Sequence, residues 1–198
     1  MNQKEFFNSM AEKWDSICHH DSDKINEILD FTDIPPGSRV LDVGTGTGVM
    51  VPFLVSRAGG SGEITAVDAA EKMIEIARGK HGYSNVSFIA CDVFDFDFPP
   101  EHFDIIMCYS VFPHFESKPA AVKKLAKLLK PGGKIVICHS QSREQINSMH
   151  KRASRVVSED NLPGAGVIEG YFSGLGFSTP VKVDDERMFV VIGQKKTS

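Results

Sequence analysis

Apolar and polar positions along the chain follow two different periods in turn. Some stretches carry apolar residues three and four positions apart, which is typical of helices with one buried face. Between them lie short, mostly apolar runs that end near glycine, proline or an acid, which is typical of strands buried on both faces. Helices are predicted at 3–16, 23–31, from the glycine turn to 57, 71–80, 118–130, from 142 onward and at 167–175. Strands are predicted from 40 and at 63–67, 86–91, 103–108, 134–138, 177–184 and 187–194.

The order of these elements predicts an α/β domain. Strands that alternate with helices form a parallel, doubly wound sheet, because each helix returns the chain to the same edge. The last two strands are joined by a tight turn at Asp185-Glu186, so we expect them to pair antiparallel. We expect one domain over residues 1–198, with helices on both faces of the sheet.

The stretch 40–48, VLDVGTGTG, joins a predicted strand to a glycine-rich turn. Gly44, Gly46 and Gly48 alternate there, which suits a sharp turn against a ligand, where a Cβ would clash. A helix that begins at this turn would direct backbone N–H groups at a carboxylate or another anion. Asp42, at the end of the strand, could hold a cationic or hydroxyl-bearing group. The G-x-G-x-G spacing differs from the G-x-G-x-x-G of dinucleotide folds, and a pure turn role stays open.

Four further stretches follow in an order that matches a known family. They are 64–74 (ITAVDAAEKMI), 88–98 (FIACDVFDFDF), 103–115 (FDIIMCYSVFPHF) and 128–138 (LLKPGGKIVIC). With 40–48, they resemble the motifs of class I S-adenosylmethionine-dependent methyltransferases over residues 35–138, and the N-terminal helices resemble those of its small-molecule branch. The resemblance implies a Rossmann-like, seven-stranded, mostly parallel sheet with an antiparallel C-terminal strand. It also implies S-adenosylmethionine as cofactor and S-adenosylhomocysteine as product.

The resemblance assigns cofactor contacts as well. Asp68, at the end of the second strand, would accept hydrogen bonds from both ribose hydroxyls, while a helix N-cap role stays open. Asp92 and Val93 stand where the family binds adenine, although an Asp after a strand also starts turns. Ser110 would meet the methionyl or ribose portion, and Trp14 would either lie near the methionine end or be structural. The full set implied for the cofactor is Asp42, Gly44, Thr45, Gly46, Gly48, Asp68, Ala69, Met73, Asp92, Val93, Ser110 and Trp14.

Composition agrees with one soluble, enzyme-sized domain. The chain has 198 residues, of which 41% are hydrophobic and 24% charged, enough for a substantial core. A net charge of −4 gives no general attraction to nucleic acid or to an anionic membrane. No apolar run approaches a membrane span and residues 1–10 lack a signal-peptide core, so we expect a cytoplasmic protein. We expect a small-molecule partner, and either a monomer or a homodimer.

Residues 1–34 are predicted to form helices that cap the cofactor edge of the sheet. Within them, Cys18, His19 and His20 suggest a metal site, but three adjacent side chains do not converge easily on one ion. The four cysteines form no CxxC pair, which indicates neither a zinc nor a disulfide framework. We therefore expect no metal.

Two histidines are candidates for the chemistry. His114 follows the fourth predicted strand and His139 follows the fifth, so both should lie at the carboxyl edge of a doubly wound sheet. Either could act as a base or orient a substrate, while a packing or capping role for His114 stays open.

The helix after 142 carries scattered cations. Ser142 and Gln145 form a capping box that starts it. Arg143 and His150 lie seven positions apart, on one side of the helix. They belong either to a plain surface helix or, with His139, to a substrate lid over residues 139–175 that faces an anionic acceptor. A histidine metal pair is the less favoured alternative. The predicted inward face is Ile146, Met149, Ala153 and Val156.

The implied reaction is in-line transfer of a methyl group from a sulfonium. The protein then mainly positions the reactants, and a base is needed only where the acceptor atom must lose a proton. We expect a small-molecule acceptor, because the short chain lacks an added recognition domain and an Asn-Pro-Pro-Tyr-like motif after the fourth strand. A tRNA or protein methyltransferase, a non-catalytic cofactor-binding protein and a nicotinamide enzyme stay as alternatives.

Overall fold

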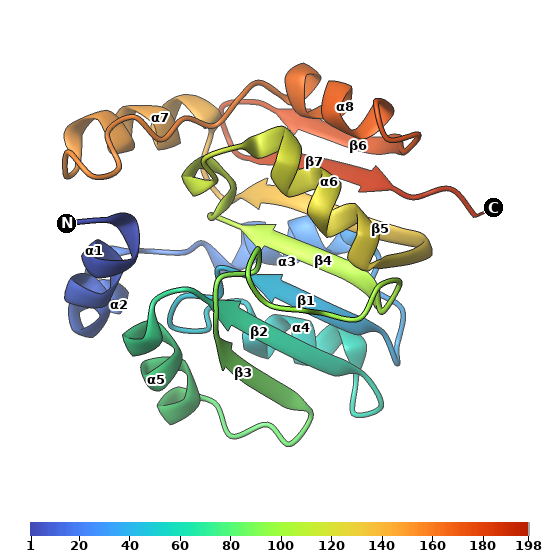
Figure 1. The fold of residues 1–198 in the computed structure, drawn as a ribbon, viewed down its shortest axis with the longest axis horizontal. Helices are drawn as coiled ribbons and strands as arrows, with labels where there is room; N and C mark the ends of the chain where they lie inside the picture. Colours follow the sequence, from blue (N-terminus) through green and yellow to red (C-terminus); the bar gives the residue numbers. More distant parts are fainter. Residues whose placement is uncertain (198) are drawn as a thin grey trace.

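A seven-stranded sheet forms the centre of the computed structural model, which describes residues 1–197 (Figure 1). Its order is β3-β2-β1-β4-β5-β7-β6. The strands are β1 (Arg39–Val43), β2 (Glu63–Asp68), β3 (Val86–Ala90), β4 (Phe103–Tyr109), β5 (Leu129–His139), β6 (Ser178–Asp184) and β7 (Phe189–Gln194). The strand order reverses between β1 and β4, and open α/β sheets bind ligands at the carboxyl ends of the strands beside such a switch point.

Strand direction matches the predicted mixed sheet. β1 pairs parallel with β2 and β4, β2 with β3, and β4 with β5. β7 pairs antiparallel with both β5 and β6, so it alone runs against the other six strands. The prediction of a Rossmann-like, mostly parallel sheet with an antiparallel C-terminal strand is confirmed.

Helices cover both faces of this sheet, and α1, α2 and α7 lie beyond the carboxyl ends of the parallel strands (Figure 1). The described residues form α1 (Gln3–Met10), α2 (Trp14–Ile17), α3 (Ser22–Thr32), α4 (Val51–Ala58), α5 (Glu71–Lys80), α6 (Lys118–Leu128), α7 (Arg143–Arg152) and α8 (Ala165–Ser173). Two 3-10 turns, η1 (Ala11–Lys13) and η2 (Phe112–His114), complete them. None of the helices in residues 1–197 has the length and apolar character needed to cross a bilayer.

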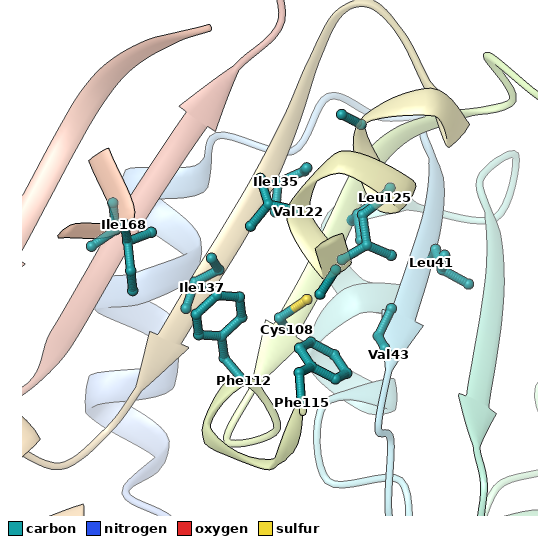
Figure 2. Close-up of a cluster of buried hydrophobic side chains, with 14 of the residues drawn as sticks. Leu41, Val43, Cys108, Phe112, Phe115, Val122, Leu125, Ile135, Ile137 and Ile168 are labelled. Carbon is teal, nitrogen blue, oxygen red and sulfur yellow. The ribbon is translucent and has the colours of Figure 1, made fainter. Parts of the chain in front are cut away.

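The alternation of β1 explains why this strand is apolar on both faces. Leu41 and Val43 join the core that α6 and α8 cover, where Val122 also packs (Figure 2). Val40 points to the opposite face and joins the core beneath α3 and α4, together with Leu54. Successive side chains of a strand alternate between faces, so a strand between two helical layers needs apolar residues on both faces, and Asp42 is the buried polar exception in β1.

Three predicted boundaries are wrong in an instructive way. The helix expected at 3–16 is broken by η1, which separates α1 from α2. The helix expected to open directly at the glycine turn begins only at Val51, with Pro52 in its first turn as expected. β5 starts at Leu129, so Pro131-Gly132-Gly133 lies within the strand as an irregularity in its pairing with β4. Local apolar spacing does not fix such ends, because tertiary contacts decide where the backbone bonds change partners.

Candidate active site

A cavity of about 700 Å³ opens at the switch point, beyond the carboxyl ends of β1, β2 and β4. Its walls come from the segments that follow β1, β2, β3 and β4, and its cover comes from α1 and α2. Pockets for small molecules and cofactors commonly enclose about 300–1,000 Å³. The cavity therefore has room for a cofactor together with a small second ligand.

The glycine loop after β1 forms one wall. Gly44, Gly46 and Gly48 all have positive φ, at 68°, 56° and 86°. A Cβ on Gly44 would lie 2.7 Å from the Cβ of Val111, so this position accepts only glycine without a shift of the neighbouring loop. Gly44 and Gly46 line the cavity, whereas Gly48 lies behind the loop against the ring of His81.

Three backbone N–H groups of the loop already have hydrogen-bond partners. The Thr45 N–H donates to the Val67 carbonyl and the Gly48 N–H to the Thr45 carbonyl, both at 2.9 Å. The Gly46 N–H donates to Oδ2 of Asp68, also at 2.9 Å. These groups are not free, and α4 begins after the loop, so the prediction that a helix N-terminus here presents free N–H groups to an anion is wrong.

Asp42 supports the loop from behind. The carboxyl is 1% exposed and accepts a hydrogen bond from Oγ1 of Thr45 at 2.6 Å. Burial raises the pKa of Asp42 to about 7, against the effect of the Thr45 hydrogen bond. Asp42 does not line the cavity, while Thr45 does. The position of Asp42 therefore fits a role in holding Thr45. It does not fit the direct contact between Asp42 and a ligand that the sequence predicted.

Asp68 lies on the cavity wall between two backbone donors. Oδ2 accepts from Gly46 and Oδ1 accepts from the Ala70 N–H, at 2.8 Å. The N-cap of α5 is Ala70, so Asp68 is not itself the cap. Burial raises the pKa of Asp68, and the two backbone hydrogen bonds oppose that shift. Each carboxylate oxygen can accept more than one hydrogen bond, so both remain able to bind a hydroxyl.

The wall next to Asp68 suits a planar base. β2 and β3 pair in parallel, so the segments that follow them lie side by side. Asp92 and Val93 line the cavity there, as do Ala69 and Met73. Oδ1 of Asp92 accepts from the Phe94 N–H at 2.8 Å and leaves the other oxygen for a ligand. Two carboxylates with an apolar surface between them match the hydroxyls, amine and ring of a nucleoside.

Trp14 and Ser110 lie where the glycine loop meets the N-terminal helices, and both line the cavity. The Trp14 ring packs edge-on against Phe7, with ring centroids 5.6 Å apart. Its neighbour Asp15 accepts from Oγ1 of Thr47 at 2.6 Å and from Nζ of Lys80 at 2.8 Å, which ties α2 to the loop. Ser110 has a φ of 57°, a conformation that costs energy for a residue with a Cβ.

His20, Tyr109 and Ser140 form a chain of polar contacts that reaches the cavity. His20 lines the cavity, and its Nδ1 lies 3.0 Å from the hydroxyl of Tyr109. That hydroxyl is 2.8 Å from Oγ of Ser140. The sequence marked His20 only as a metal candidate, whereas the structure places it in a hydrogen-bonded chain at the cavity. Within residues 1–197, no three His, Cys, Asp or Glu side chains are arranged to hold a metal ion.

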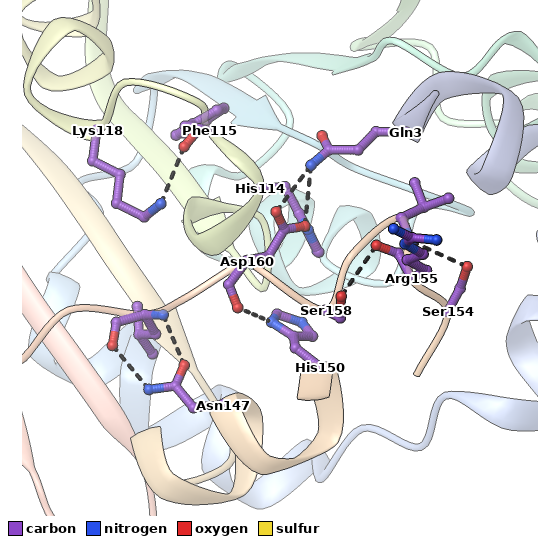
Figure 3. Close-up of polar contacts among 12 residues, drawn as sticks. Gln3, His114, Phe115, Lys118, Asn147, His150, Ser154, Arg155, Ser158 and Asp160 are labelled. Carbon is purple, nitrogen blue, oxygen red and sulfur yellow. Dashed lines mark hydrogen bonds and ion pairs between the residues drawn. The ribbon is translucent and has the colours of Figure 1, made fainter. Parts of the chain in front are cut away.

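His114 lines the cavity beside the N-terminal segment. Its Nδ1 lies 2.6 Å from Oδ2 of Asp160, and the same carboxylate accepts from Nε2 of Gln3 (Figure 3). Phe7 packs edge-on against the His114 ring, with centroids 5.1 Å apart. His114, Gln3 and Phe7 line the cavity. Sequence reasoning missed Gln3, Phe7 and Asp160, because no motif surrounds them and they come from opposite ends of the chain.

His139 lies outside the cavity, contrary to expectation. Its side chain is 1% exposed, neither ring nitrogen has a hydrogen-bond partner among the described residues, and the ring packs near Phe189. Burial lowers the pKa of His139 to about 3, with smaller contributions from His114 and His150, so it stays neutral. A buried ring that does not line the cavity has no route for exchanging a proton with a ligand there.

The predicted lid is oriented differently from the expectation. Ile146 is buried in α7 as predicted, but the other buried residue of this helix is His150, whereas Met149 is 49% exposed and Ala153 is exposed. The predicted inward face is therefore right at Ile146 and wrong at Met149 and Ala153. Arg143 binds Asp184 through Nε at 3.0 Å, and neither Arg143 nor His150 lines the cavity. The His150 Nδ1 donates instead to the Asp160 carbonyl at 3.0 Å. The sequence of α7 allows either Met149 or His150 to face inward with Ile146. Contacts with the 153–164 segment, such as those of His150 with Asp160 and of Asn147 with Leu162, turn His150 inward.

The fold and the cavity together define a class of protein. A doubly wound sheet with a glycine loop after β1 and acids after β2 and β3 is typical of enzymes that bind a nucleoside cofactor at the switch point. Comparison with known proteins narrows this class.

A model of the methyltransferase domain family matches residues 34–172. The ubiquinone/menaquinone biosynthesis C-methyltransferase UbiE of Ectopseudomonas mendocina (strain ymp) is 28% identical over 142 residues, which cover 67% of this chain and 56% of that protein. The crystal structure of a SAM-dependent methyltransferase from Aquifex aeolicus superposes with a TM-score of 0.72 and 19% identity, covering 98% of this chain and 99% of that one. The [4+2]-cyclase SpnF superposes with a TM-score of 0.79 and 15% identity, covering 98% and 95%.

The chain belongs to the methyltransferase domain family, and the cofactor of this family is S-adenosylmethionine. The structure fits that cofactor, because Gly44 leaves no room for a side chain beside the cavity and Asp68 offers two acceptor oxygens in it. The chain spans little more than half the length of the curated relative described above.

Proposed function

We propose that this protein transfers a methyl group from S-adenosylmethionine to a small-molecule acceptor. The main observation behind this proposal is that Asp68, Asp92, the glycine loop and His114 all line one continuous cavity. The bound cofactor supplies an electrophilic methyl group on a sulfonium. The residues of this chain bind it, exclude water and align the acceptor, which is the main contribution a protein makes to such a displacement.

The cover over the cavity favours a small acceptor over a polymer. Asn2, Gln3 and Lys4 of the N-terminal segment line the cavity, and Gln3 reaches across to Asp160. An RNA or a folded protein would need an open approach to this end, where α1 now lies. The net charge of −4 gives no general attraction to RNA either.

The part of the cavity around His114 suits an acceptor with an apolar ring and an ionisable hydrogen. Phe7, Trp14 and Val111 supply apolar surface, and His114 supplies the titratable group. UbiE is named a ubiquinone/menaquinone biosynthesis C-methyltransferase, and a hydroxylated aromatic ring matches these surroundings. A permanently anionic acceptor is less well supported than a hydroxylated ring. Two basic side chains that could attract an anion are already paired, since Arg143 binds Asp184 and Lys4 binds Glu71.

Binding can be followed through the only tryptophan of the chain, Trp14. We expect S-adenosylhomocysteine to bind with micromolar affinity in calorimetry and to change the Trp14 fluorescence, and NAD to do neither. Incubation with methyl-labelled S-adenosylmethionine and a panel of hydroquinones and catechols should then label one acceptor. Binding of NAD alone would contradict the proposal. Binding of S-adenosylhomocysteine with no labelled acceptor, small or macromolecular, would favour the non-methylating alternative, of which SpnF, a [4+2]-cyclase of similar fold, is a precedent.

A further inference from the structure

Asp160 forms hydrogen bonds with residues from three parts of the chain that are distant in sequence, namely His114, Gln3 and His150. Its Oδ2 is 2.6 Å from Nδ1 of His114, and both of its oxygens lie 3.1 Å from Nε2 of Gln3. Its backbone carbonyl accepts from Nδ1 of His150 at 3.0 Å. Figure 3 shows the carboxylate of Asp160 between Gln3 and His114, with His150 on its other side. The arrangement therefore forms only when α1, η2 and α7 with its following segment are all in place.

The contact fixes which nitrogen of His114 can accept a proton. A carboxylate only accepts hydrogen bonds, so Nδ1 carries the hydrogen that points to Asp160. The Nε2 atom is then the basic nitrogen, and among the described residues it has no hydrogen-bond partner. His114 lines the cavity, and its side chain is 16% exposed, against 13% for Asp160. An imidazole held in this way by a carboxylate resembles the base of a catalytic dyad in geometry.

The main charged groups near His114 are the carboxylates of Asp160 and Asp68. The groups facing it are Asp160 from the 153–164 segment, His150 from α7, His139 from β5 and Asp68 from β2, with Lys118 of α6 beyond Asp160. Burial lowers the pKa of both His139 and His150, and His114 lowers each of them further. Both rings are therefore neutral at pH 7, and His114 has carboxylates on two sides.

We propose that Asp160 is a positioning residue, which holds His114 so that Nε2 accepts a proton from the methyl acceptor, and that Gln3 holds Asp160 when α1 covers the cavity. The inference rests on the proposed function. The acceptor atom forms the new bond to the methyl carbon, and the bond from sulfur to that carbon breaks with its electron pair left on sulfur. The hydrogen on the acceptor passes as a proton to Nε2, and the resulting imidazolium is stabilised by Asp160 before it releases the proton to water.

The first test needs no acceptor. In NMR spectra of the ligand-free full chain, the Nδ1–H of His114 should give a strongly downfield resonance. That resonance should be absent in His114→Gln and lost or moved far upfield in Asp160→Asn. The matched control is Glu159→Gln, which removes the same charge from an exposed neighbour and should keep the resonance. An unchanged resonance in Asp160→Asn would overturn the proposal.

The second test measures turnover with whichever hydroquinone or catechol is methylated. Asp160→Asn should lower kcat by roughly 100-fold, within the range for loss of general base catalysis. The KM for S-adenosylmethionine should change less than about threefold, and Asp160→Glu should restore part of the rate. Gln3→Ala should lower kcat by about tenfold, because it removes hydrogen bonds that only support the dyad.

The two proposals fail differently. Full activity of Asp160→Asn in a methylating enzyme would overturn the dyad and leave the methyltransferase function intact. An intact downfield resonance in a protein that methylates no acceptor would contradict the proposed function and leave the contact between His114 and Asp160 standing.

Discussion

The two ends of the cavity are built by different means. At the cofactor end, each wall is a short segment that directly follows its own strand, such as the glycine loop after β1 or Asp68 at the end of β2. At the acceptor end, Gln3 and Asp160 are 157 positions apart, and His114 lies 46 positions from Asp160. The first end is set by strand order and local backbone. The second exists only through contacts between elements that are remote in sequence.

This difference has consequences for what each end can tolerate. A parallel sheet places the carboxyl ends of its strands together, so the cofactor end forms whenever the sheet forms. The acceptor end depends on how α1 and the segment after α7 dock onto that scaffold. We expect substitutions at the first end to affect cofactor binding or stability, and substitutions at the second to affect turnover.

The largest expected effect is at Asp68. Replacement by Ala removes the acceptor for the ribose hydroxyls, and hydrogen bonds to a charged group contribute about 1.5–3 kcal/mol each. We expect the affinity for S-adenosylhomocysteine to fall at least 100-fold in calorimetry while the fold remains. Glu75→Ala, on the exposed side of α5, is the control and should bind like the parent. Parent-like binding by Asp68→Ala would mean that the ribose lies elsewhere.

Asp42 provides a pH test of the scaffold behind the glycine loop. Its pKa is raised from 3.8 to about 7, so between these values the folded protein holds a proton that the unfolded chain has released. This costs stability as pH rises from about 4 to 7, and the cost, up to about 4 kcal/mol, is constant above pH 7.

In urea denaturation, Asp42→Asn should therefore gain stability relative to the parent as pH rises from 4 to 7, with no further gain at pH 8. The comparison must use the difference between the two proteins, since other groups titrate in both. A pH-independent difference would show that the buried Asp42 is charged throughout this range.

Gly44 tests the close approach of the loop to Val111. Gly44→Ala places a Cβ at a φ of 68° and against the Val111 side chain, so we expect a loss of about 2 kcal/mol in the free energy of unfolding. Gly79→Ala, in α5, meets no atom within 4 Å and should stabilise slightly. Equal effects of both substitutions would mean that the loop can move away without cost.

The smallest expected effect is at Arg143. Its guanidinium forms an exposed ion pair with Asp184, and such pairs contribute about 0.5 kcal/mol. Arg143→Ala should change stability by no more than that, and should leave the affinity for S-adenosylhomocysteine and the KM for the acceptor within about twofold. A large rise in the acceptor KM alone would restore the anion-binding lid that the sequence suggested and would place α7 over the cavity during turnover.

The sequence by itself determined the sheet and most of the cofactor wall. Strands are recognisable as short, mostly apolar runs. Gly44, Asp68 and Asp92 each stand at or just after the end of such a run, where chain direction carries them to the edge of the sheet that holds the cavity. The antiparallel end of the sheet was likewise predictable, because the tight turn at 185–186 leaves the last two strands no other pairing.

Only the tertiary structure decided which residues form the acceptor end. His114 and His139 lie near the carboxyl ends of the neighbouring strands β4 and β5, yet His114 lines the cavity and His139 is buried outside it. Side-chain spacing cannot distinguish them, because burial depends on what docks above each strand end. No local sequence pattern marks Asp160 or Gln3 as a site residue. Their hydrogen bond joins positions 157 residues apart, and such a contact produces no periodicity in the sequence.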